Sequence, residues 1–317
     1  MTVSVVTPVF NASKKLEKYL KSIQEQSFSD LQIVLVDDGS TDGSLEICQA
    51  TAQEDARITV LHQKNAGPAA ARNTGLDAAG GEWIVFVDAD DRLEQDYIEH
   101  MVNAAQETEA DIVASDCMML ESNRAHPFGM TVAGRVYESR EMLWEAFLSD
   151  KLAWSLWAKL YRASLFVDRR FNKNDYIAED LDMNVRLFLV DGLRLASIDS
   201  VGYWYCIDEG TVDHSFTQRH LCQLEIFERV VLAFRASGII CNASAEVFYE
   251  ERVLNALRKA IDAGALRGTV KEAFERAVAL HRDEALRSPF ASASLKRRLQ
   301  ATKMGLTAFA ALHKIHP

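Results

Sequence analysis

The stretch Trp83-Ile84-Val85-Phe86-Val87-Asp88-Ala89-Asp90-Asp91 decides the fold class of this chain of 317 residues. It begins with five large apolar residues in a row, a pattern typical of a strand that is buried on both faces. Three carboxylates follow at once. Clustered carboxylates repel one another unless a cation lies between them, but Asp is also a favoured residue at the start of a helix. Taken by itself, the stretch therefore leaves two interpretations open, a metal site and a helix cap.

The sequence around this stretch alternates between strand-like and helix-like patterns. Before it we expect strands over residues 3–10, 31–36 and 58–61, and helices over residues 14–26, 43–54 and 69–79. Such an alternation predicts an α/β fold whose central sheet is mainly parallel, with right-handed crossovers. Further along we expect helices over 95–107 and 180–190, strands near 111–115, 193–198 and 202–207, and a hairpin or loop region over 116–140. Helical sequence around residues 140–148 is expected to continue toward residue 160, and amphipathic helices follow residue 216.

Composition excludes several classes of protein. A hydrophobic content of 48% and a charged content of 26% are ordinary for a soluble globular chain. The net charge of −11 argues against a general nucleic-acid binder, which would carry a basic surface. The five cysteines are odd in number and far apart, so neither a disulfide framework nor a zinc site is indicated. Strand-like sequence begins at Thr2, which leaves no room for a signal peptide, and no apolar run is long enough to span a bilayer. We therefore expect a cytoplasmic protein.

The C-terminal segment has the opposite charge to the rest of the chain. Residues 287–317 contain six basic residues and no acidic one, so the remaining residues carry 29 basic and 46 acidic groups, a net charge of −17. Apolar residues recur in the same segment at Leu295, Leu299, Met304, Leu306, Phe309 and Leu312. This pattern fits an amphipathic helix on an anionic inner membrane surface. It also fits a helix that packs on the protein body with its charges in solvent, which is the interpretation we prefer.

Polar residues follow several of the expected strands. They are Thr7-Pro8-Val9, Asp37-Asp38, Asn65-x-Gly67 with Arg72, and Asp88-x-Asp90. The carboxyl ends of parallel strands meet at one edge of a sheet, where α/β proteins bind ligands. No glycine-rich GxGxxG sequence follows the first strand and no Walker A loop is present, so a dinucleotide site is not indicated. Mg²⁺ or Mn²⁺ on Asp88 and Asp90 would neutralise phosphates instead. The alternative for Asp38 is a turn residue, and for Arg72 a solvated helix residue.

Four ordered segments together resemble the family 2 glycosyltransferases of GT-A fold. They are Val5–Asn11, Val36–Asp42, Asn65–Asn73 and Asp88–Asp91, and the resemblance covers about residues 3–95. It implies an inverting transferase that uses a nucleotide-sugar, usually UDP-linked, with Mn²⁺ or Mg²⁺. By this resemblance, Thr7, Pro8 and Asp38 hold the uracil and ribose, Arg72 approaches the nucleotide, and Asp88 and Asp90 serve the ribose and the metal-diphosphate. The implied donor-binding residues are Thr7, Pro8, Val9, Asp38, Asn65, Gly67, Arg72, Asp88, Ala89 and Asp90. Asp91 is then left as the cap of the next helix.

The second half of the chain carries weaker signals of the same family. Ala178-Glu179-Asp180-Leu181-Asp182 resembles the family's ED motif, which supplies a catalytic base. A sugar hydroxyl is a poor nucleophile unless a carboxylate accepts its proton. We assign this role to Asp180, with Glu179 as the fallback. The alternative is an acidic helix start that is favoured by the helix dipole.

Two more segments resemble parts of the family. Trp154–Arg162 resembles the WxK segment beside the acceptor, with Trp157 and Lys159 on the acceptor side, although aromatic residues at this spacing are as often part of a core. Tyr203–Ser215 resembles the closing loop, in which Cys206 stands where many members have Arg. His214 is a candidate third metal ligand beside Asp88 and Asp90.

The sequence therefore predicts a transfer reaction and its setting. We expect an inverting glycosyltransferase, moving a hexosyl or N-acetylhexosaminyl group from a UDP-sugar to a hydroxyl of a glycan, lipid-linked or protein-linked acceptor. The alternative is a nucleotide-sugar-binding or regulatory protein of the same fold with impaired catalysis, which Cys206 favours. The expected parts are a donor half over 1–115, an acceptor half over 116–215 and a helical extension over 216–317. A peripheral contact of that extension with the membrane stays open.

Overall fold

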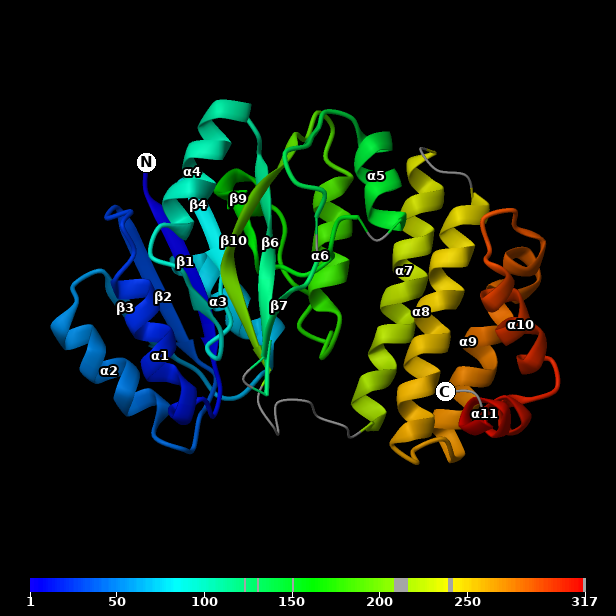
Figure 1. Cartoon of the computed structure of the whole chain (residues 1–317). Helices are drawn as coiled ribbons and strands as arrows, with labels where there is room; N and C mark the ends of the chain where they lie inside the picture. Colours follow the sequence, from blue (N-terminus) through cyan, green and yellow to red (C-terminus); the bar gives the residue numbers. More distant parts are fainter. Residues whose placement is uncertain (123, 130, 150, 208–215, 239–241, 316–317) are drawn as a thin grey trace. The chain divides into compact units, whose positions relative to one another are not determined.

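The computed structural model describes residues 1–122, 124–129, 131–149, 151–207, 216–238 and 242–315. The chain forms two compact units, here called the sheet unit (residues 1–174 and 179–211) and the helical unit (residues 175–178 and 212–317). Figure 1 shows the strands in the sheet unit and the bundled helices of the other unit. Each unit is described by itself.

The sheet unit starts with four strands separated by three helices, as the sequence predicts. These elements are β1 (Val3–Val9), α1 (Ser13–Gln24), β2 (Leu31–Asp37), α2 (Ser44–Glu54), β3 (Ile58–His62), α3 (Pro68–Ala78) and β4 (Trp83–Phe86). Their strands lie in the order β3-β2-β1-β4 and all pair in parallel. The carboxyl ends of β1, β2 and β3 are in register, because Val9 lies opposite Asp37 and Asp37 opposite His62. The polar residues after these strands therefore meet at one edge.

The later part of the sheet unit completes a mixed sheet. Its elements are β5 (Arg92–Leu93), α4 (Tyr97–Thr108), β6 (Ile112–Glu121), β7 (Arg124–Pro127), β8 (Val136–Tyr137), α5 (Arg140–Leu148), β9 (Lys159–Arg162), the 3-10 helix η1 (Ala163–Phe166), α6 (Glu179–Phe188) and β10 (Leu195–Ile207). The strand order continues from β4 as β9-β6-β10-β5, with β7 beside β6 and β8 beside β10. The hairpin expected after residue 116 is present as β6 and β7.

Two sequence-based expectations about this region are wrong. Helical structure does not continue to residue 160: α5 ends at Leu148, and Leu160 and Tyr161 lie in β9, antiparallel to β4 and β6. Pairing on both sides buries these two side chains completely, so tertiary context overrides the local helical pattern. The two strands expected near 193–198 and 202–207 form the single strand β10, whose pairing with β6 shifts register between Ile198 and Tyr203.

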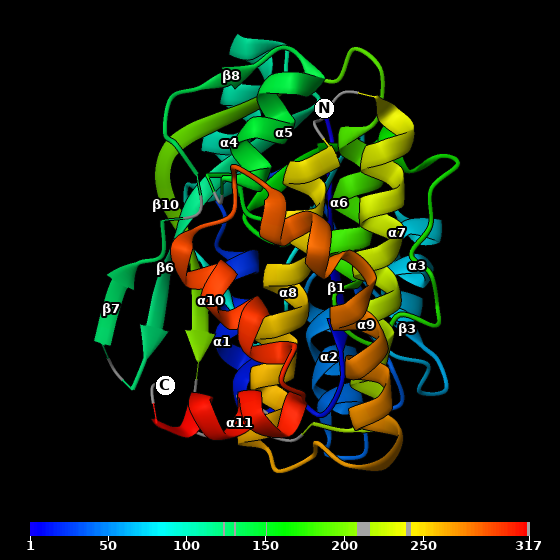
Figure 2. The same ribbon diagram turned by 90° about the vertical axis from the view of Figure 1, so that its right-hand side faces the viewer.

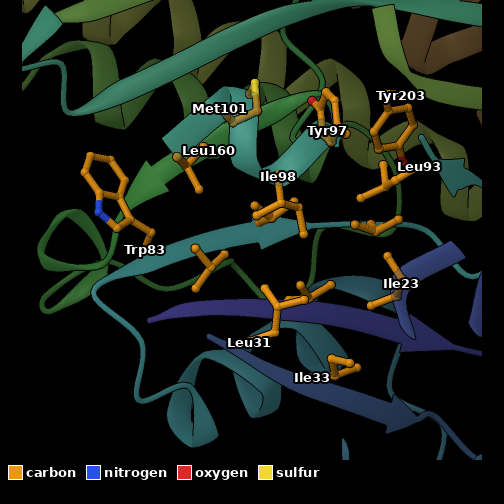
Figure 3. Packing of buried hydrophobic residues seen from close by; sticks show 14 of the residues in the cluster. Ile23, Leu31, Ile33, Trp83, Leu93, Tyr97, Ile98, Met101, Leu160 and Tyr203 are labelled. Carbon is orange, nitrogen blue, oxygen red and sulfur yellow. The ribbon is translucent and has the colours of Figure 1, made fainter. Parts of the chain in front are cut away.

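Helices cover the sheet and enclose a core of apolar side chains. Helix α1 buries Leu16, Tyr19, Leu20 and Ile23, the face that its sequence spacing predicts. Burial of the three aliphatic side chains among them, Leu16, Leu20 and Ile23, contributes on the order of 1.5–3 kcal/mol each. Figure 3 shows the same core, in which α4 contributes Ile98 and Met101, and the strands contribute Leu160 and Trp83.

Close packing of α3 against β1 depends on Gly75. A Cβ atom at this position would lie 2.4 Å from Cγ1 of Val6, which is closer than real Cβ contacts allow. The absence of a side chain therefore lets α3 approach the strand. One turn earlier on the same helix, Arg72 is held against the edge of the sheet.

The helical unit contains η2 (Gln218–Leu221), α7 (Cys222–Ser237), α8 (Asn242–Asp262), α9 (Gly268–Arg287), α10 (Ala293–Thr302) and α11 (Leu306–Ile315). Figures 1 and 2 show α8 and α9 running side by side. Leu295, Leu299, Leu306 and Phe309 of the basic C-terminal segment are buried within this unit, which favours packing over insertion of that face into a membrane surface. Within the described parts of the chain, no helix is both long and apolar enough to cross a bilayer.

Candidate active site

The three residues predicted at the end of β1 differ in how far they are buried. Thr7 is fully buried and its hydroxyl hydrogen-bonds to the hydroxyl of Tyr19. Val9 is also buried, whereas Pro8 is partly exposed. Of the three residues predicted here, Pro8 is therefore the one with side-chain surface for a ligand.

The two carboxylates after β2 hold different loops. Asp38 is almost fully buried and accepts hydrogen bonds from the backbone N–H groups of Ala66 (2.9 Å) and Gly67 (2.8 Å), and from Gln63 (2.7 Å). These bonds fix the loop that carries Asn65, which is exposed. Asp37 accepts a hydrogen bond from the backbone N–H of Gly39 in the following turn, and it is hydrogen-bonded to the His62 ring at the end of β3.

Replacing Asp38 by Ala is expected to lower the free energy of unfolding by about 1–3 kcal/mol, because the amides of Ala66 and Gly67 lose their acceptor. Urea unfolding of the purified variant measures this loss. The matched control is Asp30→Ala, which removes an exposed carboxylate paired with the N-terminus and is expected to change stability by less than about 0.5 kcal/mol. Equal stability of the two variants would show that the 63–67 loop holds its shape without Asp38.

Arg72 is the buried centre of an ion-pair cluster and not a solvated helix residue. The residue is 7% exposed, and its guanidinium has Nη2 3.1 Å from Oδ1 of Asp88 and Nη1 hydrogen-bonded to Oε1 of Glu179. Burial opposes its charge, but the carboxylates of Glu179 and Asp88 outweigh that effect and raise the pKa of Arg72. One arginine therefore joins the end of β4 to the start of α6.

The carboxylates after β4 have distinct surroundings. Asp88 and Asp90 each keep about a third of their side-chain surface exposed (31%), and Nζ of Lys15 lies 3.2 Å from Oδ2 of Asp90. Burial and the charge of Asp88 raise the pKa of Asp90, against the effect of Lys15. Ala89 between them is buried. The two partly exposed carboxylates thus lie close together at the edge, each beside one cationic side chain.

Asp91 is not the cap of the next helix, contrary to expectation. Helix α4 begins at Tyr97 and Asp96 occupies its cap position. Asp91 is 2% exposed and accepts hydrogen bonds from the Tyr203 hydroxyl (2.6 Å) and the backbone N–H of Cys206 (2.9 Å). The pairing of β5 with β10 places these donors above it. Asp91 therefore ties β10 to the edge of the site.

Asp88 and Asp90 fit a divalent cation of the magnesium type. Among the described residues, no three His, Cys, Asp or Glu side chains are grouped so as to hold a metal ion by themselves. Mg²⁺ commonly binds through one or two carboxylates together with substrate phosphates, so two exposed carboxylates meet its needs. A cation would also offset the burial and the Asp88 charge, which together raise the pKa of Asp90. His214, the predicted third ligand, lies outside the described residues.

Glu179 and Asp180 open α6 but play unequal parts. Glu179 is 8% exposed and engaged by Arg72, whereas Asp180 is half-buried and accepts a hydrogen bond from the backbone N–H of Leu181. Burial and the neighbouring Glu179 charge raise the pKa of Asp180 to about 7, and Arg72 opposes this rise. A carboxyl group with such a pKa is suited to accept a proton near neutral pH.

Of the two predicted acceptor-side residues, Trp157 lies in an aromatic cluster and Lys159 is buried nearby in sequence. The Trp157 ring is half-buried and stacks on Tyr203 (5.3 Å between centroids) and Tyr205 (4.9 Å), and the exposed Phe128 leans against it. Lys159 is fully enclosed, donates to the carbonyl of Ser155 at 2.7 Å, and has its pKa lowered to about 7 by burial. Lys159 is thus a supporting residue. The alternation Tyr203-x-Tyr205, which places both rings on one face of a strand, is the sequence pattern that could have predicted this aromatic cluster.

Comparisons with known proteins show which proteins this chain is similar to. A family model described as glycosyl transferase family 2 matches residues 4–157. Glycosyltransferase GlyA of Streptococcus pneumoniae is 34% identical over 240 residues, which are 73% of this chain and 34% of GlyA. The GalNAc(5)-diNAcBac-PP-undecaprenol beta-1,3-glucosyltransferase of Campylobacter jejuni is 33% identical over 176 residues, 55% of each chain. This chain thus spans between about a third and about half of the length of these two relatives.

A solved structure extends the similarity to the whole fold. Staphylococcus aureus TarS 1-349 in complex with UDP-GlcNAc superposes with a TM-score of 0.74 at 20% identity, over 99% of this chain and 91% of that chain. The fold is therefore GT-A, with a mixed sheet, flanking helices and C-terminal helices. The chain belongs to the family 2 glycosyltransferases.

Proposed function

We propose that this chain transfers a sugar from a UDP-sugar to a hydroxyl group of a glycan, lipid-linked or protein-linked acceptor, with inversion at the anomeric carbon. The observation that carries this proposal is the Arg72 bridge between Asp88 and Glu179. It joins the carboxylates expected on the donor side to the residue next to Asp180. The UDP-GlcNAc in the TarS complex and the undecaprenol-linked substrate in the Campylobacter relative's name support the donor and acceptor classes.

The donor would lie along the carboxyl edge of β1, β2 and β4. Pro8 and the loop held by Asp38, with Asn65 and Gly67, offer surface for the nucleoside. Asp88 and Asp90 offer oxygen ligands where the ribose and diphosphate follow. When bound at these two carboxylates, Mn²⁺ or Mg²⁺ supplies positive charge that stabilises the leaving diphosphate.

Asp180 would act as the base for the acceptor. In a single displacement, the acceptor oxygen forms a bond to the anomeric carbon while the bond from that carbon to the UDP oxygen breaks. The proton of the acceptor hydroxyl passes to the Asp180 carboxylate, and the bonding electron pair leaves with UDP. Glu179 cannot share this role while Arg72 holds it.

The aromatic cluster would position the acceptor. Phe128 is 47% exposed, and Trp157 beside it is held at a fixed angle by its stacking on Tyr203 and Tyr205. The apolar face of a sugar ring can pack on such rings. Lys159 fixes the backbone at Ser155, next to Trp157, and so acts as a positioning residue.

Removal of the metal is expected to weaken UDP binding by about tenfold or more, because Asp88 and Asp90 would then face the diphosphate without the divalent cation between them. Titration calorimetry with UDP in Mn²⁺ and after chelation measures this effect. Asp90→Asn should bind UDP more weakly in Mn²⁺, whereas Asp77→Asn, an exposed carboxylate on α3, serves as the matched control. An unchanged affinity after chelation would overturn the metal assignment.

The reaction itself is tested by incubating the protein with UDP-GlcNAc, UDP-galactose or UDP-glucose and Mn²⁺, and measuring the release of UDP with candidate acceptors. Release that depends on an acceptor supports the proposed transfer. Tight binding of UDP-sugars with no release under any condition would instead favour the impaired, regulatory form of the same fold. If UDP does not bind at all, both the proposed transfer and the regulatory alternative are wrong.

A further inference from the structure

The Trp157 ring is carried by a stretch of chain without regular secondary structure. Residues 153–158 lie in neither a helix nor a strand, between α5 and β9. Ser155 and Leu156 are nevertheless buried. Buried backbone carbonyls need hydrogen-bond donors, and outside helices and sheets these donors have to come from side chains or water. We call residues 154–157 the Trp157 segment.

Side chains from α6 and β9 supply donors to this segment. The Nδ2 atom of Asn184 donates to the carbonyls of Trp154 (2.7 Å) and Ser155 (3.1 Å). The Nζ atom of Lys159 donates to the same Ser155 carbonyl at 2.7 Å. The backbone path that leads to Trp157 is therefore fixed by side chains of two neighbouring elements.

Asn184 fits this position with every polar atom of its side chain. The residue is fully buried, and its Oδ1 lies 3.0 Å from the Tyr161 hydroxyl, which is also 3.3 Å from the carbonyl of Leu156. Both carbonyls that face Nδ2 are acceptors, so only the NH₂ end of an amide can face them. A carboxylate here would place an acceptor against two acceptors, and an alanine would leave both carbonyls without this donor.

Asn184 shares a helix face with the proposed base. It follows Asp180 by four positions on α6, and residues four apart on a helix lie on the same face, about 6 Å apart along the axis. The helix is a rigid element. A shift of the Trp157 segment relative to Asp180 would therefore break the hydrogen bonds of Asn184.

The turn after Trp157 has an unusual backbone conformation. Ala158 has a φ of +57°, in the left-handed region that residues with a Cβ atom rarely adopt. Ala158 is fully buried, and its carbonyl accepts a hydrogen bond from the backbone N–H of Ser115 in β6 at 3.0 Å. Such a conformation persists only where the surrounding structure fixes it. Trp157 is thus held on one side by Asn184 and on the other by this turn.

We propose that Asn184 is a positioning residue for the acceptor. Its amide holds the Trp157 segment at a fixed place relative to Asp180, so that a sugar packed on the Trp157 ring presents its hydroxyl to the base. Asn184 acts through the backbone of the segment and does not touch the acceptor. This inference rests on the proposed function and adds the residue that couples the acceptor side to the base.

The test compares Asn184→Ala with the matched control Gln32→Ala. Gln32 also carries a side-chain amide that bonds to two backbone groups, the carbonyl of Ala78 (2.9 Å) and the N–H of Gly80 (2.7 Å). It lies near the start of β2, at the opposite end of that strand from Asp37. Thermal unfolding measures the stability that each variant loses, and the assays are run below both transitions.

The first readout is the ¹⁹F NMR spectrum of the full-length protein labelled with 5-fluorotryptophan. Trp157→Phe identifies the Trp157 resonance among those of the five tryptophans. We expect Asn184→Ala to shift or broaden this resonance and Gln32→Ala to leave it in place. UDP affinity in Mg²⁺ should stay at the wild-type value in both variants. An unchanged Trp157 resonance in Asn184→Ala would overturn the inference.

The second readout is sugar transfer from a UDP-sugar to p-nitrophenyl β-glucoside or p-nitrophenyl β-N-acetylglucosaminide. Asn184→Ala should lower kcat/KM for the acceptor by about tenfold or more, since a misplacement of about 1 Å can cost on the order of 100-fold. The rise of the rate with pH should remain, because Asp180 is still present. A merely structural role would weaken UDP binding and acceptor use alike, and that result would overturn the inference.

A milder variant covers the case in which Asn184→Ala does not fold. Tyr161→Phe removes only the hydroxyl that lies beside Asn184 and Leu156, so we expect a smaller change of the Trp157 resonance. No change in this variant would count against the inference. If the wild type binds no UDP, the proposed function fails. If the wild type transfers sugar and Asn184→Ala transfers it equally well, only the positioning role fails, so the two failures are distinguishable.

Discussion

Replacement of Asp180 by Asn is expected to lower the rate of sugar transfer by at least about 100-fold, because general-base catalysis typically contributes about 10²–10⁴ in rate. UDP affinity should stay at its wild-type value, since Asp180 lies at α6 and not among the carboxylates expected to hold the diphosphate. Steady-state measurement of UDP release, together with calorimetric UDP binding, separates these two effects.

The pH dependence of the same reaction provides a second readout. Burial and the Glu179 charge raise the pKa of Asp180 to about 7, so this carboxyl loses its proton as pH rises through that value. The wild-type rate should therefore rise about tenfold in total between pH 6 and pH 8, and its slope should approach tenfold per pH unit only below about pH 6. The Asn variant should lack this limb.

The matched control is Asp182→Asn, two residues further along α6, where the carboxylate pairs with Arg186 at 2.9 Å. We expect it to keep most of the transfer rate and the rising limb. If Asp180→Asn keeps more than a tenth of the wild-type rate, or if the wild-type rate is flat over this pH range, Asp180 is not the base.

Replacement of Arg72 by Met is expected to lower the free energy of unfolding by about 3 kcal/mol or more, because it leaves Glu179 buried and Asp88 partly buried without their cation. Removing one partner of a buried pair costs more than the pair contributes. Urea unfolding measures the loss. The control Arg170→Met breaks an exposed pair with Asp77 and should cost less than about 1 kcal/mol.

A double variant identifies the cause of the Arg72 effect. Arg72→Met/Glu179→Gln removes the buried charge together with its partner, so it should be more stable than Arg72→Met alone. The change in the free energy of unfolding of the double variant, minus the sum of the changes for the two single variants, is the coupling between the two positions. If the double variant is as unstable as the sum of the single ones, the loss comes from packing of the arginine side chain and not from charge.

Most of the first half of the fold was predictable from the sequence. The strands at β1, β2, β3 and β4 carry continuous apolar runs, and the α1 face shows helical spacing, so local pattern and tertiary environment agree. The β9 segment was not predictable in this way. Its residues around Leu160 fit a helical pattern, and pairing with β4 and β6 decides their structure.

The sequence by itself determined which chemical groups gather at the edge of the sheet. The strand ends place Asp38, Arg72, Asp88 and Asp90 there, because the carboxyl ends of parallel strands share one edge. Only the tertiary structure decided how these groups pair. Arg72 joins Asp88 to Glu179, 107 positions away in sequence from the arginine, and Asp91 turns toward Tyr203, 112 positions away. Such pairings depend on burial and on the balance of charge between distant segments. The Trp83–Asp91 stretch contains no local sequence pattern that predicts them.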